Sequence, residues 1–216
     1  MHTLETLWHD PRVAVKLRTT LTSPFGRKVR IAAEVLGLSS RLAIRPADTL
    51  DPADDLRHQN PLGKMPCLVI GDEAFYDSGV ILEMLDALAG GDRLLPSAAA
   101  PLERARALTQ ARLADGLTEA ALLMVYEYRF RTPEQVSGRW LEHQRGKITR
   151  SLAVFEAAPP AADKPNLISI GLACGLGYLD WRQPVEWRGD HPALVRWLAA
   201  FSNAVPAFSA TESKPR

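Results

Sequence analysis

Ser23 is the residue whose type and position best suit the activation of a nucleophile. It stands where a predicted strand ends and a predicted helix begins, with Thr22 before it and Pro24 after it. At such a junction a hydroxyl group and the helix N-terminal amides converge on a negative charge. Serine is also a preferred helix N-cap. The residues alone therefore leave two roles for Ser23, a helix cap or a donor to a bound anion, with Thr22 as the alternative hydroxyl.

A second group of polar residues flanks a predicted hairpin within residues 60–78. The apolar, partly β-branched run 67–70 predicts a strand, and residues 74–76 predict its antiparallel return. Gly71 and Asp72 between them are typical of a two-residue hairpin turn.

The entry to this hairpin holds Lys64, Met65 and Pro66, and its exit holds Asp77 and Ser78. Proline is tolerated as the first residue of a strand, and a cis bond there would turn the Met65 backbone outward, where it can pair with a ligand. Asp77 and Ser78 are favourable residues for the start of the next helix. Lys64 is expected either to meet an anion or to be solvated.

Cys67 is the one candidate for thiol chemistry next to these residues, but its position in the strand favours the core. Side chains alternate along a strand, so Cys67 should belong to the sheet interior when the Met65 backbone faces a ligand. Free cysteine behaves there as a small apolar residue. No His or Cys cluster has metal-ligand spacing, and no glycine-rich phosphate loop follows a strand. We therefore expect no metal.

The elements that must position these residues are read from hydrophobic periodicity. Residues 13–21 alternate as a half-buried strand, and a helix with one apolar face follows from Pro24 until Gly37 ends it. On that helix Arg27, Lys28 and Arg30 are assigned to the polar face. The remaining predicted elements are a short strand at 42–44, a short helix at 54–58, the hairpin, and a helix at 79–88. The order is βαβαββα.

The second half of the sequence predicts helices only. Ala89 to Asp92 breaks the preceding helix and 96–101 is small and structureless, which places a domain boundary near 90–101. Thr132 to Gln135 offers the cap of a helix running to Phe155, and Asn166 offers the cap of the next helix. The predicted domains are 13–90 and 101–216. We assign the aromatic side chains of Trp140, Trp181, Trp187 and Trp197 to packing.

Composition excludes several classes of function. Among 216 residues, 26 Lys and Arg nearly balance 25 Asp and Glu, which implies no extended nucleic-acid or anionic-membrane surface. No segment approaches a membrane span, and residues 1–11 have no signal-peptide pattern and are expected to be a loose extension. The two cysteines, Cys67 and Cys174, suit reduced thiols, so the expected location is the cytoplasm.

Three separate motifs resemble the bacterial cytosolic glutathione S-transferase family. Gly-Lys-Met-Pro-Cys-Leu at 63–68 with Tyr-Asp-Ser at 76–78 looks like its glutathione-binding half. The segment Ser23 to Arg30 resembles its first active-site turn and helix, and Gly177 to Arg182 resembles a segment of its helical domain. The resemblance implies an N-terminal thioredoxin-like domain of α/β class followed by an all-helical, all-α domain.

The resemblance also implies roles for residues. In this family a Ser or Tyr hydroxyl donates to the glutathione sulfur and favours the thiolate, a role that falls here to Ser23 or Thr22. Lys64, Met65, Pro66, Asp77 and Ser78 would then bind glutathione, with Asp77 and Ser78 pairing the ammonium and carboxylate of its γ-glutamyl end. The electrophile-binding residues that the resemblance implies are Phe25, Leu122, Tyr126, Tyr128 and Phe130, although an aromatic stripe at helical spacing is more often part of a core.

The predicted function is therefore that of a glutathione transferase, a homodimeric detoxification enzyme that uses glutathione as co-substrate and attacks a small apolar electrophile. Serine at position 23 cannot perform the disulfide exchange of members with a cysteine there. An isomerase or dehalogenase on the same fold is the enzymatic alternative, because fold does not decide the reaction. The alternative of another class is a non-catalytic binding protein, similar to the bacterial starvation proteins that contact RNA polymerase.

Overall fold

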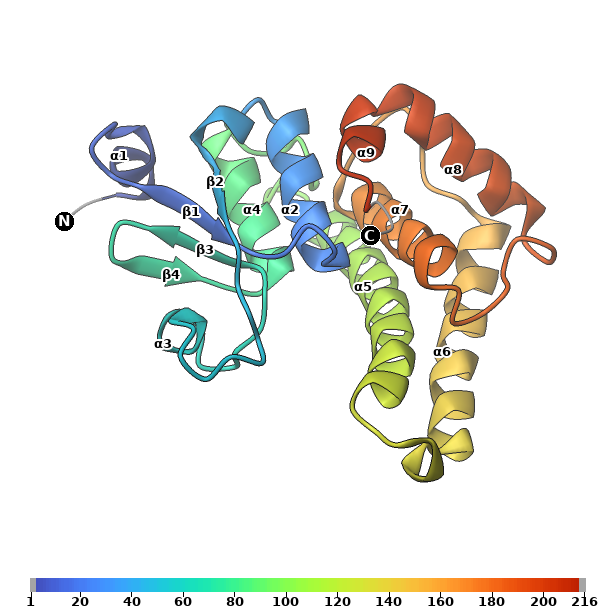
Figure 1. Cartoon of the computed structure of the whole chain (residues 1–216). Helices are drawn as coiled ribbons and strands as arrows, with labels where there is room; N and C mark the ends of the chain where they lie inside the picture. Colours follow the sequence, from blue (N-terminus) through green and yellow to red (C-terminus); the bar gives the residue numbers. More distant parts are fainter. Residues whose placement is uncertain (1–2, 214–216) are drawn as a thin grey trace. The chain divides into compact units, whose positions relative to one another are not determined.

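The computed structural model describes residues 3–213, which form two compact units: residues 3–104 with Ser213, and residues 105–212 (Figure 1). The elements of the first unit are α1 (Leu4–His9), β1 (Val15–Arg18), α2 (Pro24–Val35), the 3-10 turn η1 (Ser39–Arg41), β2 (Ala43–Arg45), α3 (Leu56–Gln59), β3 (Cys67–Ile70), β4 (Glu73–Phe75) and α4 (Ser78–Leu88). Helix α5 (Pro101–Arg129) begins in this unit and continues into the second. There it is followed by η2 (Pro133–Gln135), α6 (Gly138–Ala157), α7 (Leu167–Arg182), α8 (Pro192–Ala204) and α9 (Pro206–Ala210).

The described strands form a mixed four-stranded sheet in the order β2-β1-β3-β4. Strand β1 is parallel to β2 and antiparallel to β3, and β3 is antiparallel to β4. In the hairpin Ile70 pairs with Glu73, so Gly71 and Asp72 form the two-residue turn. Gly71 has φ 60° at the first turn position, where glycine is favoured because it adopts positive φ without steric cost. This is the predicted thioredoxin-like arrangement.

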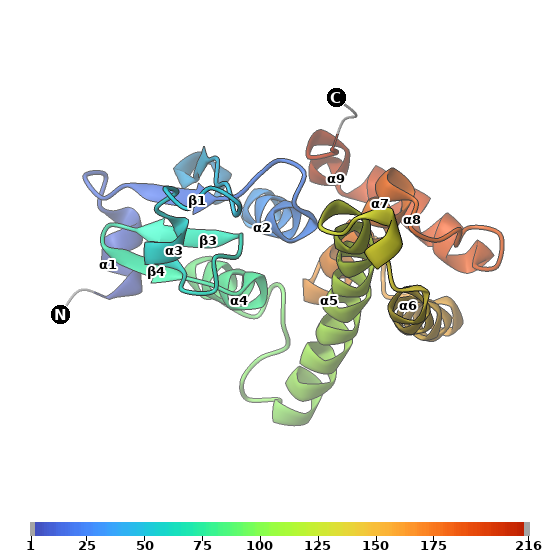
Figure 2. The same ribbon diagram turned by 60° about the horizontal axis from the view of Figure 1, so that its bottom comes forward.

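The two faces of β3 carry different packing. Cys67 and Val69 face one side, where they contact Ala47 and Leu56 of α3. Alternation along the strand places Leu68 and Ile70 on the opposite side, and both are fully buried. Helices α2 and α4, which carry the proposed site residues at their N-termini, pack side by side in both views (Figures 1 and 2).

Gly26 sets how closely α2 approaches the end of β1. A Cβ atom at this position would clash with the hydroxyl oxygen of Thr19 and lie 3.0 Å from its Cβ atom. Thr19 is buried, so it has little room to move. The first turn of α2 can therefore lie against the sheet only because residue 26 has no side chain.

The expectation of a loose N-terminal extension over residues 1–11 was wrong for residues 3–11, and residues 1–2 lie outside the described part of the chain. Thr3 caps α1 by accepting a hydrogen bond from the Thr6 amide, and Trp8 is buried. The Arg41 guanidinium donates to the carbonyl oxygens of Trp8, Asp10 and Val13 at 2.9, 3.0 and 3.0 Å. The segment is ordered by a side chain distant in sequence, which no local pattern reveals.

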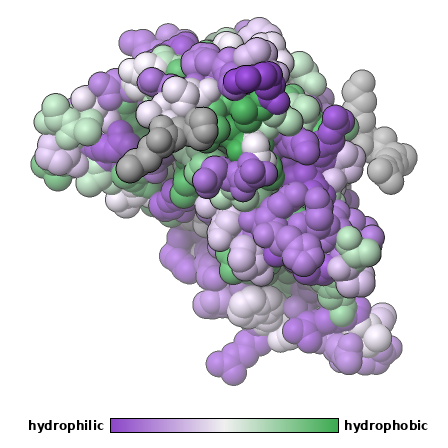
Figure 3. All heavy atoms as spheres, turned by 90° about the vertical axis from the view of Figure 1, so that its left-hand side faces the viewer, coloured by the Kyte–Doolittle hydropathy of each residue, from purple (hydrophilic) through white to green (hydrophobic). Residues whose placement is uncertain are grey.

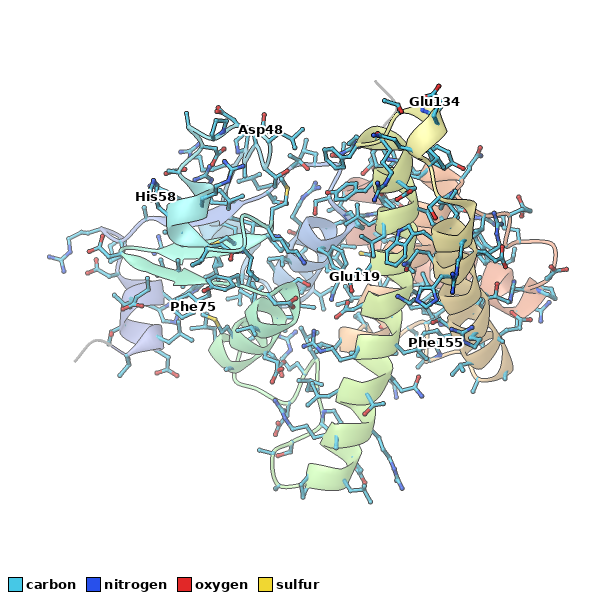
Figure 4. The ribbon with its side chains drawn as sticks, turned by 90° about the horizontal axis from the view of Figure 1, so that it is seen from below. Asp48, His58, Phe75, Glu119, Glu134 and Phe155 are labelled. Carbon is cyan, nitrogen blue, oxygen red and sulfur yellow. The ribbon has the colours of Figure 1, made fainter. Side chains whose placement is uncertain are left out.

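Among its described residues the second unit has helices joined by loops and turns, and no strand. The cap predicted at Thr132 forms, but it begins the short turn η2, and α6 starts only at Gly138 with Ser137 as its N-cap. Figure 4 labels Glu134 in this turn between α5 and α6. The cap predicted at Asn166 is confirmed: its side chain accepts from the amides of Ile168 and Ser169, and the Ser169 hydroxyl accepts from the Asn166 amide.

Hydrophilic residues predominate on the face of the molecule shown in Figure 3, with apolar residues in patches between them. Within residues 3–213, none of the helices combines the length and the apolar character that crossing a membrane would need.

Candidate functional site

The hydroxyl of Ser23 lies at the N-terminus of α2 and has one proton left to donate. Ser23 is the N-cap residue of the helix, and its Oγ accepts a hydrogen bond from the Gly26 amide at 3.1 Å. A serine hydroxyl has two acceptor lone pairs and one donor, so the cap occupies an acceptor and leaves the O–H free. The Thr22 hydroxyl is shared with that of Thr20, 3.1 Å away. The two roles considered for Ser23 are thus compatible.

Met65 connects this junction to the entry of the hairpin. Its Sδ accepts from the Thr20 amide at 3.2 Å and lies 3.5 Å from the Thr20 hydroxyl. The Met65–Pro66 peptide bond is cis, as is Tyr76–Asp77. Among the described residues, the amide and carbonyl of Met65 make no hydrogen bond to another backbone group. They can therefore pair with an extended ligand next to the Ser23 junction.

Lys64 precedes this pair on an ordered loop. Its side chain is exposed, and its carbonyl oxygen accepts from the Asn60 side-chain amide at 2.8 Å. Asn60 is buried, so the loop backbone is anchored while the lysine ammonium remains in solvent. Such an ammonium can reach an anionic group of a ligand with a smaller desolvation penalty than a buried pair would have.

Asp77 and Ser78 open α4 as predicted. Asp77 is the exposed N-cap, and its Oδ1 accepts from the Gly79 amide at 2.7 Å. Ser78 is the first helical residue and is only 3% exposed, and its hydroxyl oxygen accepts from Lys28 Nζ at 3.4 Å. The pair places a carboxylate, a hydroxyl and a helix N-terminus together, which suits a group carrying both an ammonium and a carboxylate.

Arg27 and Lys28 correct the expectation of a solvated face on α2. Their exposures are 6% and 3%. One sequence signal could have identified them: cations near a helix N-terminus are unfavourable to the helix dipole, so adjacent basic residues there call for a compensating anion or contact. Hydrophobic periodicity distinguishes polar from apolar residues only, so it does not reveal the unfavourable interaction of these cations with the helix dipole.

Cys67 is confirmed as a core residue. It is fully buried in the cluster with Leu56 and Val69. Burial raises the pKa of the Cys67 thiol, although the nearby Arg18 charge and a hydrogen bond with the Phe75 backbone act in the opposite direction. The thiol is therefore protonated and inaccessible, and this position offers no thiolate nucleophile.

The helical unit contains a cavity of about 430 Å³ at the α5–α6 turn. Two of the aromatic residues expected to bind an electrophile, Tyr126 and Phe130, contact each other edge to face there with ring centroids 5.1 Å apart. Trp140, which was assigned to packing, is 40% exposed and also lines it. The other lining residues are Leu123, Glu127, Arg131 and Gln135.

The wall of this cavity is held by a buried carboxylate. Glu127 Oε1 accepts a hydrogen bond from the Ser137 amide at 2.9 Å and forms an ion pair with Arg131 Nε at 2.9 Å. Leu122 and Tyr128 are not among the lining residues, and Tyr128 is exposed. Phe25 lies in the first unit, half-buried, with its ring 5.9 Å from Lys28 Nζ. Of the five predicted electrophile residues, Tyr126 and Phe130 are the two that line this cavity.

Within the described part of the chain, no three His, Cys, Asp or Glu side chains are grouped so that they could hold a metal ion. The polar groups assembled in the first unit are hydroxyls, backbone amides, carboxylates and ammonium groups. These groups suit recognition of a small zwitterionic molecule by hydrogen bonds and charge.

Comparisons with known proteins agree with this fold. Residues 17–93 match the family model of the glutathione S-transferase N-terminal domain. The uncharacterized GST-like protein YibF of Escherichia coli (strain K12) is 35% identical over 188 residues, covering 84% of this chain and 91% of that protein. A glutathione transferase family member from Pseudomonas fluorescens Pf-5, solved with bound glutathione, is 39% identical with a TM-score of 0.83, covering 93% of this chain and 100% of that one. A glutathione S-transferase from Methylobacterium radiotolerans, solved in complex with glutathione sulfonate, is 30% identical with a TM-score of 0.81, covering 94% of this chain and 96% of that one.

Proposed function

The chain belongs to the glutathione S-transferase family, and on that premise we propose that it binds glutathione and joins its thiolate to a small apolar electrophile. The observation that carries the proposal is the Ser23 hydroxyl, whose proton is free while its oxygen is fixed by the Gly26 amide. The proposed binding residues are Ser23, Lys64, Met65, Pro66, Asp77 and Ser78.

The residues present fit the parts of glutathione. Asp77 offers an exposed carboxylate to the γ-glutamyl ammonium, while Ser78 and the N-terminus of α4 suit the γ-glutamyl carboxylate. The unpaired backbone of Met65 suits the extended cysteinyl residue. Lys64 is free to meet the glycyl carboxylate. Each charged group of the tripeptide thereby has an opposite charge or a donor on this chain.

Ser23 would favour the thiolate by donating its hydrogen bond to the sulfur. A donor to the charged form lowers the pKa of the bound thiol, and the thiolate is the nucleophile. The Gly26 amide polarises the same hydroxyl from its other side, which strengthens it as a donor. The thiol proton passes to solvent and the sulfur attacks the electrophilic carbon. With a halide the leaving group departs with its electron pair, and with an enone the displaced π electron pair is protonated by solvent.

The electrophile is proposed to be apolar because the residues predicted to bind it are mostly aromatic. The cavity with Tyr126, Phe130 and Trp140 supports an aromatic or aliphatic compound of modest size, since small-molecule sites are concave and largely apolar. The buried state of Cys67 and the absence of cysteine at position 23 favour conjugation over disulfide exchange.

We also place the protein in the cytoplasm as a homodimer. Both cysteines are buried thiols outside any disulfide, which suits a reducing compartment. Large apolar side chains are exposed in each unit, including Leu62 and Val80 in the first and Tyr128 and Phe130 in the second, and these suit burial against a second copy. Sedimentation velocity gives the association state directly: a single monomeric boundary at micromolar concentration would contradict the dimer.

Calorimetric titration with glutathione, followed by a panel of aryl halides, alkyl halides and enones, tests the function. Binding with formation of a thioether conjugate is the expected result. Consumption of substrate with glutathione regenerated would point instead to isomerisation or to hydrolytic dehalogenation, in which the tripeptide adds and is then released by water. A protein that binds no glutathione would be a non-catalytic member of the family, and the proposal would fail.

A further inference from the structure

Lys28 joins the N-terminal part of α2 to the first residue of α4. Its Nζ lies 3.4 Å from Ser78 Oγ, and both residues are only 3% exposed. The same ammonium lies 5.9 Å from the centre of the Phe25 ring, close enough for a cation–π contact. The lysine is thus held between two helices directly beside the residues proposed to bind the γ-glutamyl end of glutathione.

The direction of the Lys28–Ser78 hydrogen bond is fixed by chemistry. A lysine ammonium has three donors and no acceptor, so Lys28 must donate and Ser78 must accept. The hydroxyl proton of Ser78 is thereby directed away from Lys28. It becomes a donor for an anion placed at the N-terminus of α4, and the ammonium polarises the hydroxyl that carries it.

The charges around Ser78 differ in sign. The N-cap carboxylate of Asp77 compensates part of the positive end of the helix dipole, and the first turn of α4 adds no further acidic residue. A buried positive charge near this end is screened less than a surface charge. The combined potential favours a carboxylate, whereas a ligand ammonium is left to the exposed Asp77.

We propose that Lys28 is a positioning and specificity residue of the glutathione site: it orients the Ser78 hydroxyl toward the γ-glutamyl carboxylate and adds its own positive charge. The inference rests on the proposed function and deepens it. It makes recognition of the γ-glutamyl α-carboxylate depend on a residue of α2 that acts through Ser78. Selection against ligands that lack this carboxylate is the measurable consequence.

The test compares three ligands by calorimetry on the full-length protein and on Lys28→Met. They are glutathione, glutaryl-cysteinylglycine, which lacks the amino group, and γ-aminobutyryl-cysteinylglycine, which lacks the α-carboxylate. Lys28→Met should weaken the first two by about tenfold, the effect of losing one charge-assisted interaction, and leave the third nearly unchanged. Lys16→Met, at an exposed lysine of the same unit, is the matched control and should change none of them.

A double-mutant cycle of Lys28→Met with Ser78→Ala distinguishes action through Ser78 from a non-specific structural effect of the lysine substitution. If Lys28 acts through Ser78, the double variant should lose less glutathione affinity than the product of the two single losses. Lys28→Gln keeps a neutral donor for Ser78, so it should lose less than Lys28→Met, and it replaces Lys28→Met in the comparison if that variant fails to fold.

Two outcomes overturn the inference while the proposed function stands: an equal loss for all three ligands, or no loss for any. Independent, multiplicative losses in the Ser78 cycle would also overturn it. If the unmodified protein binds none of the three ligands, the proposed function fails first and the inference falls with it.

Discussion

The Ser23 hydroxyl oxygen accepts a hydrogen bond from the Gly26 amide at 3.1 Å. This contact fixes the oxygen at the start of α2 and leaves its proton directed elsewhere. The oxygen, as helix cap, contributes to the stability of α2, whereas the proton is the part proposed to act on the glutathione sulfur. Ser23→Ala removes both, and their effects are distinguished by measuring unfolding and turnover separately.

Ser23→Ala should lower turnover far more than glutathione affinity. The charged ends of the tripeptide are held by other residues, while the hydroxyl alone contacts the sulfur in our proposal. Loss of a hydrogen bond to a charged group, about 1.5 to 3 kcal/mol, corresponds to roughly one or two units in the pKa of the bound thiol. The pH–rate profile should therefore move to higher pH, as measured by steady-state kinetics and thiolate absorbance.

Thr22→Val is the matched control for that experiment. It removes the neighbouring hydroxyl, which is shared with Thr20 in the structure, and should leave the profile in place. A shifted profile in Thr22→Val with a parent-like Ser23→Ala would assign the donor to Thr22. No shift in either variant would assign activation to the helix amides.

Asp77→Ala combined with Ser78→Ala should abolish most glutathione affinity. The double variant removes the carboxylate proposed for the γ-glutamyl ammonium and the hydroxyl proposed for its carboxylate. Each lost charge-assisted bond costs roughly 1.5 to 3 kcal/mol, so the dissociation constant should rise by at least about a hundredfold. Calorimetric titration measures it, and Asp72→Ala, at an exposed position of the hairpin turn, is the control.

The Cys67 thiol should not react in the folded protein. Burial raises its pKa despite the opposing influence of Arg18, so the thiolate is depleted at neutral pH and the sulfur is inaccessible. Labelling with a thiol-reactive disulfide should therefore be slow in buffer and rapid in denaturant. Reduction of glutathione mixed disulfides that vanishes in Cys67→Ala would contradict the core assignment.

Gly26→Ala should destabilise the protein by about 1 to 3 kcal/mol, the usual cost of forcing extra volume into a packed interior. The new methyl group would meet the buried Thr19 side chain. Gly116→Ala is the matched control, because that glycine is helical and exposed with open space around its missing Cβ. It should be neutral or stabilising by up to about 1 kcal/mol in urea unfolding.

Glu156 should give the helical unit an acid-dependent stability. Burial acts to raise the pKa of its carboxyl, but hydrogen bonds from the amides of Ala193 and Leu194 outweigh it and hold the pKa below the ordinary value of 4.5. Because the folded pKa is depressed, the stabilisation is present above pH 4.5 and is lost as pH falls through the lower, folded value. Glu156→Gln should lose stability near neutral pH and show a flatter decline on acidification, measured by urea unfolding at several pH values.

Local signals in the sequence predicted much of the fold and of the candidate site. Gly71 with Asp72 fixed the hairpin, and Asp77 and Asn166 fixed helix starts, because turn and cap chemistry depends on neighbouring residues alone. The burial of Lys28 could not be predicted from neighbouring residues in the sequence. It depends on α4 packing beside α2, and no window of sequence around Lys28 contains Ser78.

The cavity at the α5–α6 turn escaped prediction for a related reason. Periodicity identifies an apolar helical face but does not distinguish a filled interface from one with space left in it. Trp140 was therefore assigned to packing although it is partly exposed. The start of α6 also differs from the prediction, because Thr132 caps the short 3-10 turn η2 and α6 begins only after that turn.

Because α1 is attached mainly through Arg41, we expect residues 3–13 to unfold locally at a lower free energy than the sheet of the same unit. A helix of six residues is too short to persist in water on its own. Its order depends on the burial of Trp8 and on the three carbonyl contacts of one guanidinium. Residues 3–13 should therefore exchange amide hydrogens and become sensitive to protease well before the sheet does, and Arg41→Ala should release this segment while the rest of the domain stays protected.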